Sequence, residues 1–307
     1  MLTRYFERPG GGILVGLLTL FCFLCFSLNA ILCRFALMTY GMEPLRYVAV
    51  RCFSGAAMLL ALWAAARLRR EGPLRLWRSL MAQSSWRCAL FLFCYMLFFA
   101  CGYVNMPSAT GTLVQNSAIQ VSMIGWGVIC GLRPGKWQLA GLGLALAGLA
   151  LLLVPGLSSP PLWNALLIAL AGLSWGGYTM AGRGVTEPAL ATAGNFLRAC
   201  LPSALVLLCS LLQEAPARTG TENQALLFAI ASGAGTSALG YTAWYAVQPR
   251  LSVVAASISQ LSVPPITAAL GFMLLGEVIS LRLVISGLII LAGIWLTLRA
   301  PARRAPA

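Results

Sequence analysis

Residues that could carry chemistry are scarce in this sequence, and most of them are polar groups inside long apolar runs. The chain contains neither His nor Asp, which excludes the usual catalytic triads, zinc sites and Asp-dependent phosphoryl transfer. It also lacks a nucleotide-binding P-loop, so ATP is not expected as a direct energy source. We therefore expect a protein that is not an enzyme and that holds no metal and no cofactor.

Amide side chains gather on one face of the apolar run between residues 109 and 130. Gln115 and Asn116 fall with Thr112 on an i, i+3, i+4 stripe of the predicted helix. Polar groups at membrane depth are costly unless they face a cavity or a partner, so these amides are candidate substrate ligands. Hydrogen bonding between helices is the equally weighted alternative for Gln115.

A second amide, Gln260, lies in a later apolar run, shortly before the pair Pro264 and Pro265. Prolines remove backbone donors, so this pair is expected to kink or open the helix. Transporters tend to place substrate at such breaks near the midplane. For Gln260, too, a packing role between helices is weighted equally with substrate contact.

Aromatic residues recur at helical spacing in several runs, and those near the middle of a run could line a cavity for amphipathic or aromatic metabolites. Tyr103, close to a helix end, is instead expected in the interfacial aromatic belt. The full set of candidate substrate-binding residues is Tyr95, Gln115, Asn116, Trp175, Tyr178, Arg198, Tyr241, Trp244 and Gln260.

Two arginines, Arg51 and Arg198, fall within predicted spans, and each follows a Glu-Pro pair. The favoured interpretation is an anchoring side chain that reaches a lipid headgroup or pairs with its own Glu. Direct contact with substrate is the alternative, and it places Arg198 among the candidates above.

The amino-acid composition indicates whether these apolar runs lie in water or in a membrane. The 307 residues are 60% hydrophobic and only 9% charged, far too apolar for a soluble globule. Runs of about twenty apolar residues recur, each long enough to cross a bilayer as a helix. The sequence therefore predicts an all-α integral membrane protein with ten transmembrane helices.

The ten cysteines lie mostly inside these runs and are expected to pack as small hydrophobes, with a metal or redox role for Cys22 and Cys25 as the weaker alternative.

The net charge of +14 sits in short connections between the spans rather than on a polar domain, which argues against a nucleic-acid partner. The densest group of arginines lies between residues 67 and 87. Because cytoplasmic loops carry excess Lys and Arg, we expect this segment and both termini to lie in the cytoplasm. The membrane expected is the inner membrane of the cell. The expected partners are a small-molecule substrate and the lipid bilayer, with a homodimer left open.

The chain also contains an internal repeat with an offset of 145 residues. Matching positions are Gln115 and Gln260, Ser117 and Ser262, Gly131 and Gly276, and the Leu-Ala-Gly triplets at 146–148 and 291–293. Residues 1–154 and 155–307 would each carry five spans, and an odd number of spans gives the two copies opposite orientations. The fold expected is therefore two inverted five-helix repeats.

These markers, with Leu-Gly-Glu ending at Glu277, resemble the EamA repeat of the drug/metabolite transporter superfamily. The first copy departs from the pattern, since Leu132 stands where the second has Glu277. The resemblance implies a ten-helix secondary transporter that exports small metabolites such as amino acids by alternating access through a central cavity. The alternatives are a membrane sensor or accessory subunit that does not transport and, less favoured, a membrane-embedded transferase.

Overall fold

The computed structural model describes residues 11–129, 132–133, 135–154, 160–182, 185–212, 221–250, 260, 262–299 and 303–304. The helices are α2 (Gly11–Arg34), η1 (Phe35–Thr39), α3 (Pro44–Glu71), α4 (Pro73–Gln83), α5 (Trp86–Gly102), α6 (Ser108–Ile129), α7 (Lys136–Leu153), α8 (Leu162–Ala181), α9 (Pro188–Leu212), α10 (Glu222–Ile230), η2 (Ala231–Leu239), α11 (Gly240–Val247), η3 (Gln248–Arg250), α13 (Val263–Leu275) and α14 (Leu281–Arg299). Of these, η1 and η2 are π-helical and continue the neighbouring α-helices. One short antiparallel pair joins β1 (Leu132–Arg133) to β2 (Arg303–Arg304).

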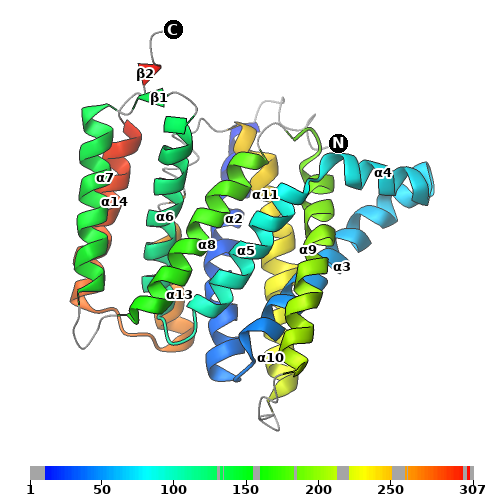
Figure 1. Cartoon of the computed structure of the whole chain (residues 1–307), viewed down its shortest axis with the longest axis horizontal. Coiled ribbons are helices and arrows are strands. Elements are labelled where there is room, and N and C mark those ends of the chain that lie inside the picture. Colours follow the sequence, from blue (N-terminus) through cyan, green and yellow to red (C-terminus); the bar gives the residue numbers. More distant parts are fainter. Residues whose placement is uncertain are drawn as a thin grey trace.

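The all-α membrane fold is confirmed, and each of the ten predicted spans contains a described helix (Figure 1). Among the described residues, five helices are long and apolar enough to cross a membrane, or six if α4 and α5, bent by 75°, form one span. The ninth predicted span is the apolar run that contains Gln260. Its residues 251–259 lie outside the described residues. The helix α13 begins at Val263, with Pro264 and Pro265 in its first turn, where the missing N–H groups have no intrahelical partner to lose. The inverted relation of the halves stays a prediction.

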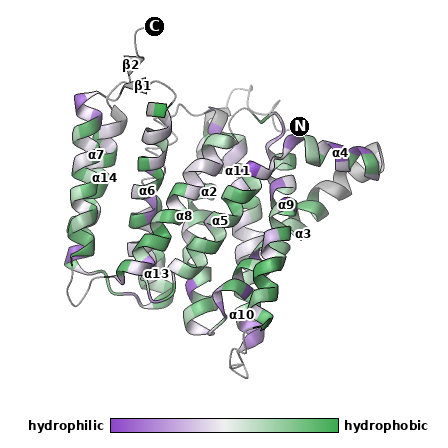
Figure 2. Cartoon of the chain, viewed as in Figure 1, coloured by the Kyte–Doolittle hydropathy of each residue, from purple (hydrophilic) through white to green (hydrophobic). Residues whose placement is uncertain are grey.

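Hydrophobic residues run along most of the helices (Figure 2), and many of the large ones are exposed on the outside of the bundle, as a lipid-facing surface requires. On α9, Leu201, Leu205 and Leu208 are each more than half exposed and share one face of the helix. The side chains buried inside the bundle include the polar residues described below. Apolar residues therefore dominate the interior as well as the exposed helix faces, and the buried polar residues are the exception.

Helices from the two halves of the chain intercalate. Each of these contacts joins a helix of the first half to one of the second half: α5 and α6 pack on α8, α3 packs on α9, α2 packs on α11 and α13, and α7 packs on α14. The pair α7 and α14 stands at one end of the bundle (Figure 1) and is joined through glycines. A Cβ on Gly141 would lie 2.5 Å from the Gly293 carbonyl oxygen, so only glycine allows this approach. Both runs consist largely of Gly, Ala and Leu, which suits such close packing.

The arginine-rich stretch between residues 67 and 87 is mostly helical rather than a loop. The helix α3 continues to Glu71, and α4 begins with Pro73 after Gly72, whose φ of 73° reverses the chain. Leu76 and Leu80 lie one turn apart on the buried face of α4. The sequence did not predict α4 because a stripe of only two buried leucines in an arginine-rich segment is a weak signal.

At the side of the bundle away from β1 and β2, Glu277 joins three segments. Gly276 ends α13 at a φ of 64° and positions the Glu277 side chain next to α6. The Glu277 carboxylate accepts hydrogen bonds from the backbone N–H and the hydroxyl of Ser108, the first residue of α6, and lies 3.2 Å from Arg34 Nε. Negative charge at a helix N-terminus is stabilising.

Candidate functional site: a central pocket

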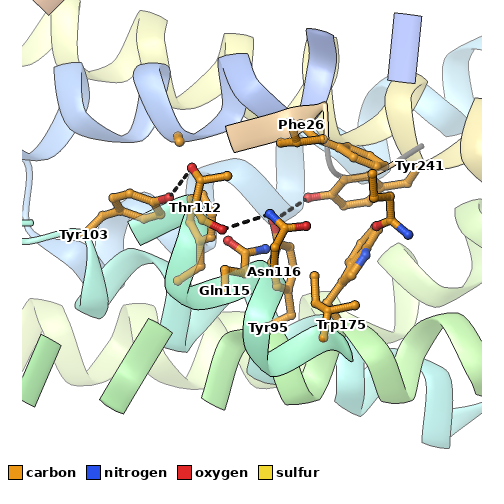
Figure 3. Close-up of a pocket in the computed structure, with 13 residues that line it drawn as sticks. Phe26, Tyr95, Tyr103, Thr112, Gln115, Asn116, Trp175 and Tyr241 are labelled. Atoms are coloured by element: carbon orange, nitrogen blue, oxygen red, sulfur yellow. Dashed lines mark hydrogen bonds between the residues drawn. The ribbon is translucent and has the colours of Figure 1, made fainter. Parts of the chain in front are cut away.

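A small pocket lies at the centre of the bundle, between α2, α5, α6, α8, α11 and residue 260 (Figure 3). Its free space is about 30 Å³. One water needs roughly 10–15 Å³ of such space, so the pocket holds about two waters and is closed to larger molecules in this conformation. Its lining residues are Phe26, Ala30, Tyr95, Phe99, Tyr103, Thr112, Gln115, Asn116, Ile119, Trp175, Tyr241, Gln260 and Val263.

The polar wall of the pocket comes from consecutive turns of α6. Asn116 Nδ2 donates to the Thr112 carbonyl oxygen at 2.8 Å, and Thr112 Oγ1 donates to the Ser108 carbonyl oxygen at 2.7 Å. These bonds orient the side chains along the stripe that the sequence predicted. Gln115 also lines the pocket, and its amide has no hydrogen-bond partner among the described residues. Gln260 reaches the same pocket from the start of the α13 region.

Small residues let the aromatic wall approach α6. A Cβ on Gly172 of α8 would clash with the Gln115 carbonyl oxygen, so glycine there brings α8 against α6. Three residues later, Trp175 enters the pocket with its ring centroid 5.0 Å from that of Tyr95 and 4.7 Å from that of Tyr241. Phe26 covers Trp175 edge-on at 5.5 Å. Such offset and edge-on contacts are the favoured aromatic geometries.

Two of the predicted aromatic candidates lie beside the pocket rather than in it. The Tyr178 ring is 5.6 Å from that of Trp175 and stacks on Tyr245. Trp244 packs against Phe23 and Phe26. Both are almost fully buried, so they support the rings that line the pocket.

Arg51 of α3 lies directly behind two of the lining tyrosines. Its side chain has no exposed surface. Nε donates to Ser237 Oγ at 2.9 Å, while Nη2 donates to Tyr241 Oη at 2.6 Å and to Tyr95 Oη at 3.5 Å. The guanidinium carbon is 5.0 Å from the Phe99 ring centroid, within cation–π range. The remaining nitrogen, Nη1, is buried without a hydrogen-bond partner in the described part of the chain.

A hydroxyl cluster continues from Arg51 toward α2. Ser237 Oγ donates to Asn29 Oδ1 at 3.2 Å, and Ser232 Oγ donates to the same oxygen at 2.8 Å. Tyr47 Oη in turn donates to Ser232 Oγ at 2.7 Å. The donor end of Asn29, Nδ2, is buried and without a partner among the described residues. This cluster holds η2 against α2 and α3 and fixes the position of Arg51.

Arg198, the arginine that the sequence placed among the candidates, is not part of this pocket. Its Nε donates to Ser84 Oγ at 3.0 Å and its Nη2 donates to the Met81 carbonyl oxygen at 3.2 Å. Its guanidinium carbon lies 5.2 Å from the Trp86 ring centroid. Arg198 therefore holds the corner between α4 and α5.

The prediction that Tyr103 belongs to an interfacial belt was wrong. Its side chain is fully buried, its hydroxyl lies 3.1 Å from Thr112 Oγ1, and it lines the pocket. Gly111 makes room for it, since a Cβ there would meet the Tyr103 ring at 2.6 Å. The four-residue spacing of Tyr95, Phe99 and Tyr103 on α5 was a signal for one shared face, and it could have placed Phe99 and Tyr103 in the pocket with Tyr95. Phe26, Ala30, Ile119 and Val263 carry no such signal in the sequence.

Comparison with known proteins places this chain in a family. The sequence model of the EamA-like transporter family matches residues 12–154 and 162–299. The uncharacterized protein PA1977 of Pseudomonas aeruginosa is 40% identical over 289 residues, which cover 94% of this chain and 96% of that protein. A probable terminal-alkyne amino-acid exporter of Streptantibioticus cattleyicolor is 30% identical over 208 residues, covering 66% of this chain and 68% of the relative.

A crystal structure with 22% sequence identity has the same fold. It superposes with a TM-score of 0.60 and covers 92% of this chain and 96% of its own. The resemblance to the EamA repeat that the sequence suggested is thus confirmed over nearly the whole chain. With its apolar helices and its two matched segments, the chain belongs to the EamA-like transporter family.

Proposed function

We propose that this protein is a secondary transporter of the inner membrane that exports small metabolites such as amino acids through the central pocket. The observation that carries the proposal is the composition of that pocket. Amide and hydroxyl groups on α6 and at residue 260 face the rings of Tyr95, Trp175 and Tyr241 in the middle of an apolar bundle. Such a lining suits a small molecule with one polar and one apolar part.

Membership of a transporter family and the kinship with a probable amino-acid exporter support the substrate class. The proposed substrate-binding residues are those that line the pocket, with Tyr178 and Trp244 supporting them. Arg198 is distant from the lining and is proposed only as a structural residue. No carboxylate is among the pocket's lining residues, which favours facilitated diffusion over proton exchange through this site.

The small size of the pocket supports alternating access. Space for about two waters is too little for an amino acid, so the lining helices must separate before substrate enters. The network around Arg34, Glu277 and Ser108 lies next to Tyr103 and joins α2, α6 and the turn after α13. We propose that these contacts break when the pocket opens toward that side.

The orientation proposed from the arginines has both termini and α4 in the cytoplasm. Figure 1 shows the start of α2, the end of α14 and α4 on one side of the bundle. A thiol-reactive, membrane-impermeant label tests this in a variant stripped of native cysteines. A cysteine placed at Glu222 should react in intact spheroplasts, whereas one placed at Ser79 should react only after permeabilisation. The reverse pattern would invert the proposed topology.

Transport is tested directly with purified protein in liposomes loaded with the twenty common L-amino acids, whose efflux is followed by mass spectrometry. We expect efflux of a subset from wild-type liposomes and none above background from empty ones. The variant Ala30→Leu adds bulk inside the pocket and should stop efflux. Its control, Leu205→Trp, adds bulk on the lipid-facing side of α9 and should not. Equal efflux from wild-type and empty liposomes would contradict the proposal, provided that the protein elutes as a folded species.

A further inference from the structure

Arg51 is a buried cation without a buried anion to match it. The one ion pair in the described residues joins Arg34 to Glu277 and does not include Arg51. Glu43, the carboxylate closest to Arg51 in sequence on the same helix, caps the start of α3 and accepts from Ser210. Burying an arginine in a membrane protein is costly, and such a residue normally faces a partner or a pathway.

The partners of Arg51 satisfy it only in part. Ser237 and the two tyrosine hydroxyls are neutral acceptors, and Nη1 has none among the described residues. A guanidinium presents parallel N–H groups that match the two oxygens of a carboxylate. Here Nη1 has no partner in the part of the chain that the structure describes, and the adjacent Nη2 donates to the Tyr241 hydroxyl at 2.6 Å. A carboxylate that displaced the Tyr241 hydroxyl could therefore accept hydrogen bonds from Nη1 and Nη2 together.

Arg51 is separated from the central pocket by a single layer of side chains. Tyr95, Phe99 and Tyr241 each line the pocket on one side and contact the guanidinium on the other. The two tyrosine hydroxyls also bond to each other at 3.2 Å, which closes this layer. A rotation of Tyr241 would remove the shorter of the two Nη2 hydrogen bonds and open the layer that separates the pocket from the guanidinium.

We propose that Arg51 binds the carboxylate group of the transported molecule, with Tyr95 and Tyr241 as the side chains that yield to it. This inference rests on the proposed function and names the substrate class as organic carboxylates, including amino acids. The rest of the substrate then lies among the aromatic rings and the Gln115 and Gln260 amides. The competing assignment is purely structural, with Arg51 as a hydrogen-bond hub that joins α3, α5 and η2.

The decisive test changes the charge on the ligand while the protein stays wild type. Liposomes holding the purified protein are loaded with an amino acid that the efflux screen identifies, with its carboxamide, or with the amine that lacks the carboxyl group. We expect efflux of the carboxamide and of the amine to be slower by about thirtyfold or more, because the guanidinium would be left unpaired. Equal rates for all three would overturn the assignment while leaving the transport proposal intact.

Variants then locate the effect at Arg51. In Arg51→Gln the preference for the carboxylate over the carboxamide should disappear, and in Arg51→Lys it should fall without vanishing, because lysine keeps the charge but loses the planar fork. The matched control is Arg198→Gln, a second arginine of the bundle, which should keep the wild-type preference. If Arg51→Gln does not fold, Arg51→Lys decides, and an unchanged preference there overturns the assignment. If wild-type protein exports no amino acid at all, this proposal falls together with the proposed function.

Discussion

The surroundings of Arg51 and Arg198 differ sharply, although both arginines follow a Glu-Pro pair on a long apolar helix. Arg198 reaches the backbone of Met81 and the hydroxyl of Ser84 at a helix corner, and its surface is only partly buried. Arg51 is fully buried, and its hydrogen-bond partners among the described residues are three side chains, of which Tyr95 and Tyr241 line the central pocket. Arg198 therefore stabilises the corner between α4 and α5, whereas Arg51 lies next to the pocket.

The difference comes from what each helix packs against. Near Arg198, Gly194 lies against the Leu80 carbonyl oxygen, so α9 meets the end of α4, where free backbone carbonyls can accept. Near Arg51, Gly233 brings the π-helical segment η2 against α3, so the guanidinium meets Ser237 and the tyrosines instead. The residues next to each arginine in the sequence do not include the groups that it contacts, Ser237 for Arg51 and Ser84 for Arg198. The environment is set by a glycine one turn before Arg198 on its own helix in the first case, and by a glycine on the neighbouring segment η2 in the second.

The largest expected effect comes from removing the close approach at Gly233. A Cβ there would clash with the Arg51 carbonyl oxygen and Ser54 Oγ, so Gly233→Ala must push η2 away from α3. We expect a loss of about 3 kcal/mol in the free energy of unfolding together with loss of transport. Gly235→Ala is the control on the same segment, because its Cβ would meet nothing within 4 Å. Thermal unfolding in detergent measures both, and equal melting of the two variants would show that α3 and η2 can separate freely.

A smaller effect is expected from Tyr241→Phe, which removes only the hydroxyl that holds Arg51 Nη2. Hydrogen bonds to charged groups contribute about 1.5–3 kcal/mol, and we expect a loss near 2 kcal/mol. Tyr245→Phe, one turn later, removes a bond to the Tyr178 carbonyl oxygen and should cost about 1 kcal/mol. Melting temperatures of the two variants test the difference, and an equal loss would mean that Arg51 gains nothing special from Tyr241. The truncation Tyr241→Ala would confuse the test, since the ring is fully buried against Trp175 and Phe196.

Much of this architecture could be predicted from sequence. The apolar runs predicted the helices, and the i, i+3, i+4 stripe predicted the α6 wall of the pocket. Two things could not be predicted. Phe26 and Ala30 belong to the lining only because α2 packs on α11 and α13, which no local pattern in α2 encodes. The different environments of Arg51 and Arg198 likewise depend on partners more than a hundred residues away in the chain.

At the α4–α5 corner, Ser84→Ala removes the acceptor of Arg198 Nε. Because Arg198 is only partly buried, solvent can replace that bond, and we expect a loss of about 1 kcal/mol or less. Ser79→Ala on the same helix is the control, since the Ser79 hydroxyl has no hydrogen bond among the described residues. Efflux should be unchanged in both variants. A strong loss of transport in Ser84→Ala alone would mean that the corner moves during transport, and the contrast between the two arginines would then fail.

The smallest effect on stability, and the sharpest separation of stability from function, is expected for Gln115→Ala. The Gln115 amide faces the pocket and has no hydrogen-bond partner among the described residues, so its removal should change the free energy of unfolding by about 0.5 kcal/mol or less. If the amide binds substrate, the KM for efflux should rise severalfold while the melting temperature stays within about 2 °C of wild type. Asn116→Ala is the matched comparison on the next residue, because Asn116 already donates to the Thr112 carbonyl oxygen and its loss should lower stability more. An unchanged KM for Gln115→Ala would move the amide contact elsewhere in the pocket and would leave Arg51 as the principal polar determinant of the site.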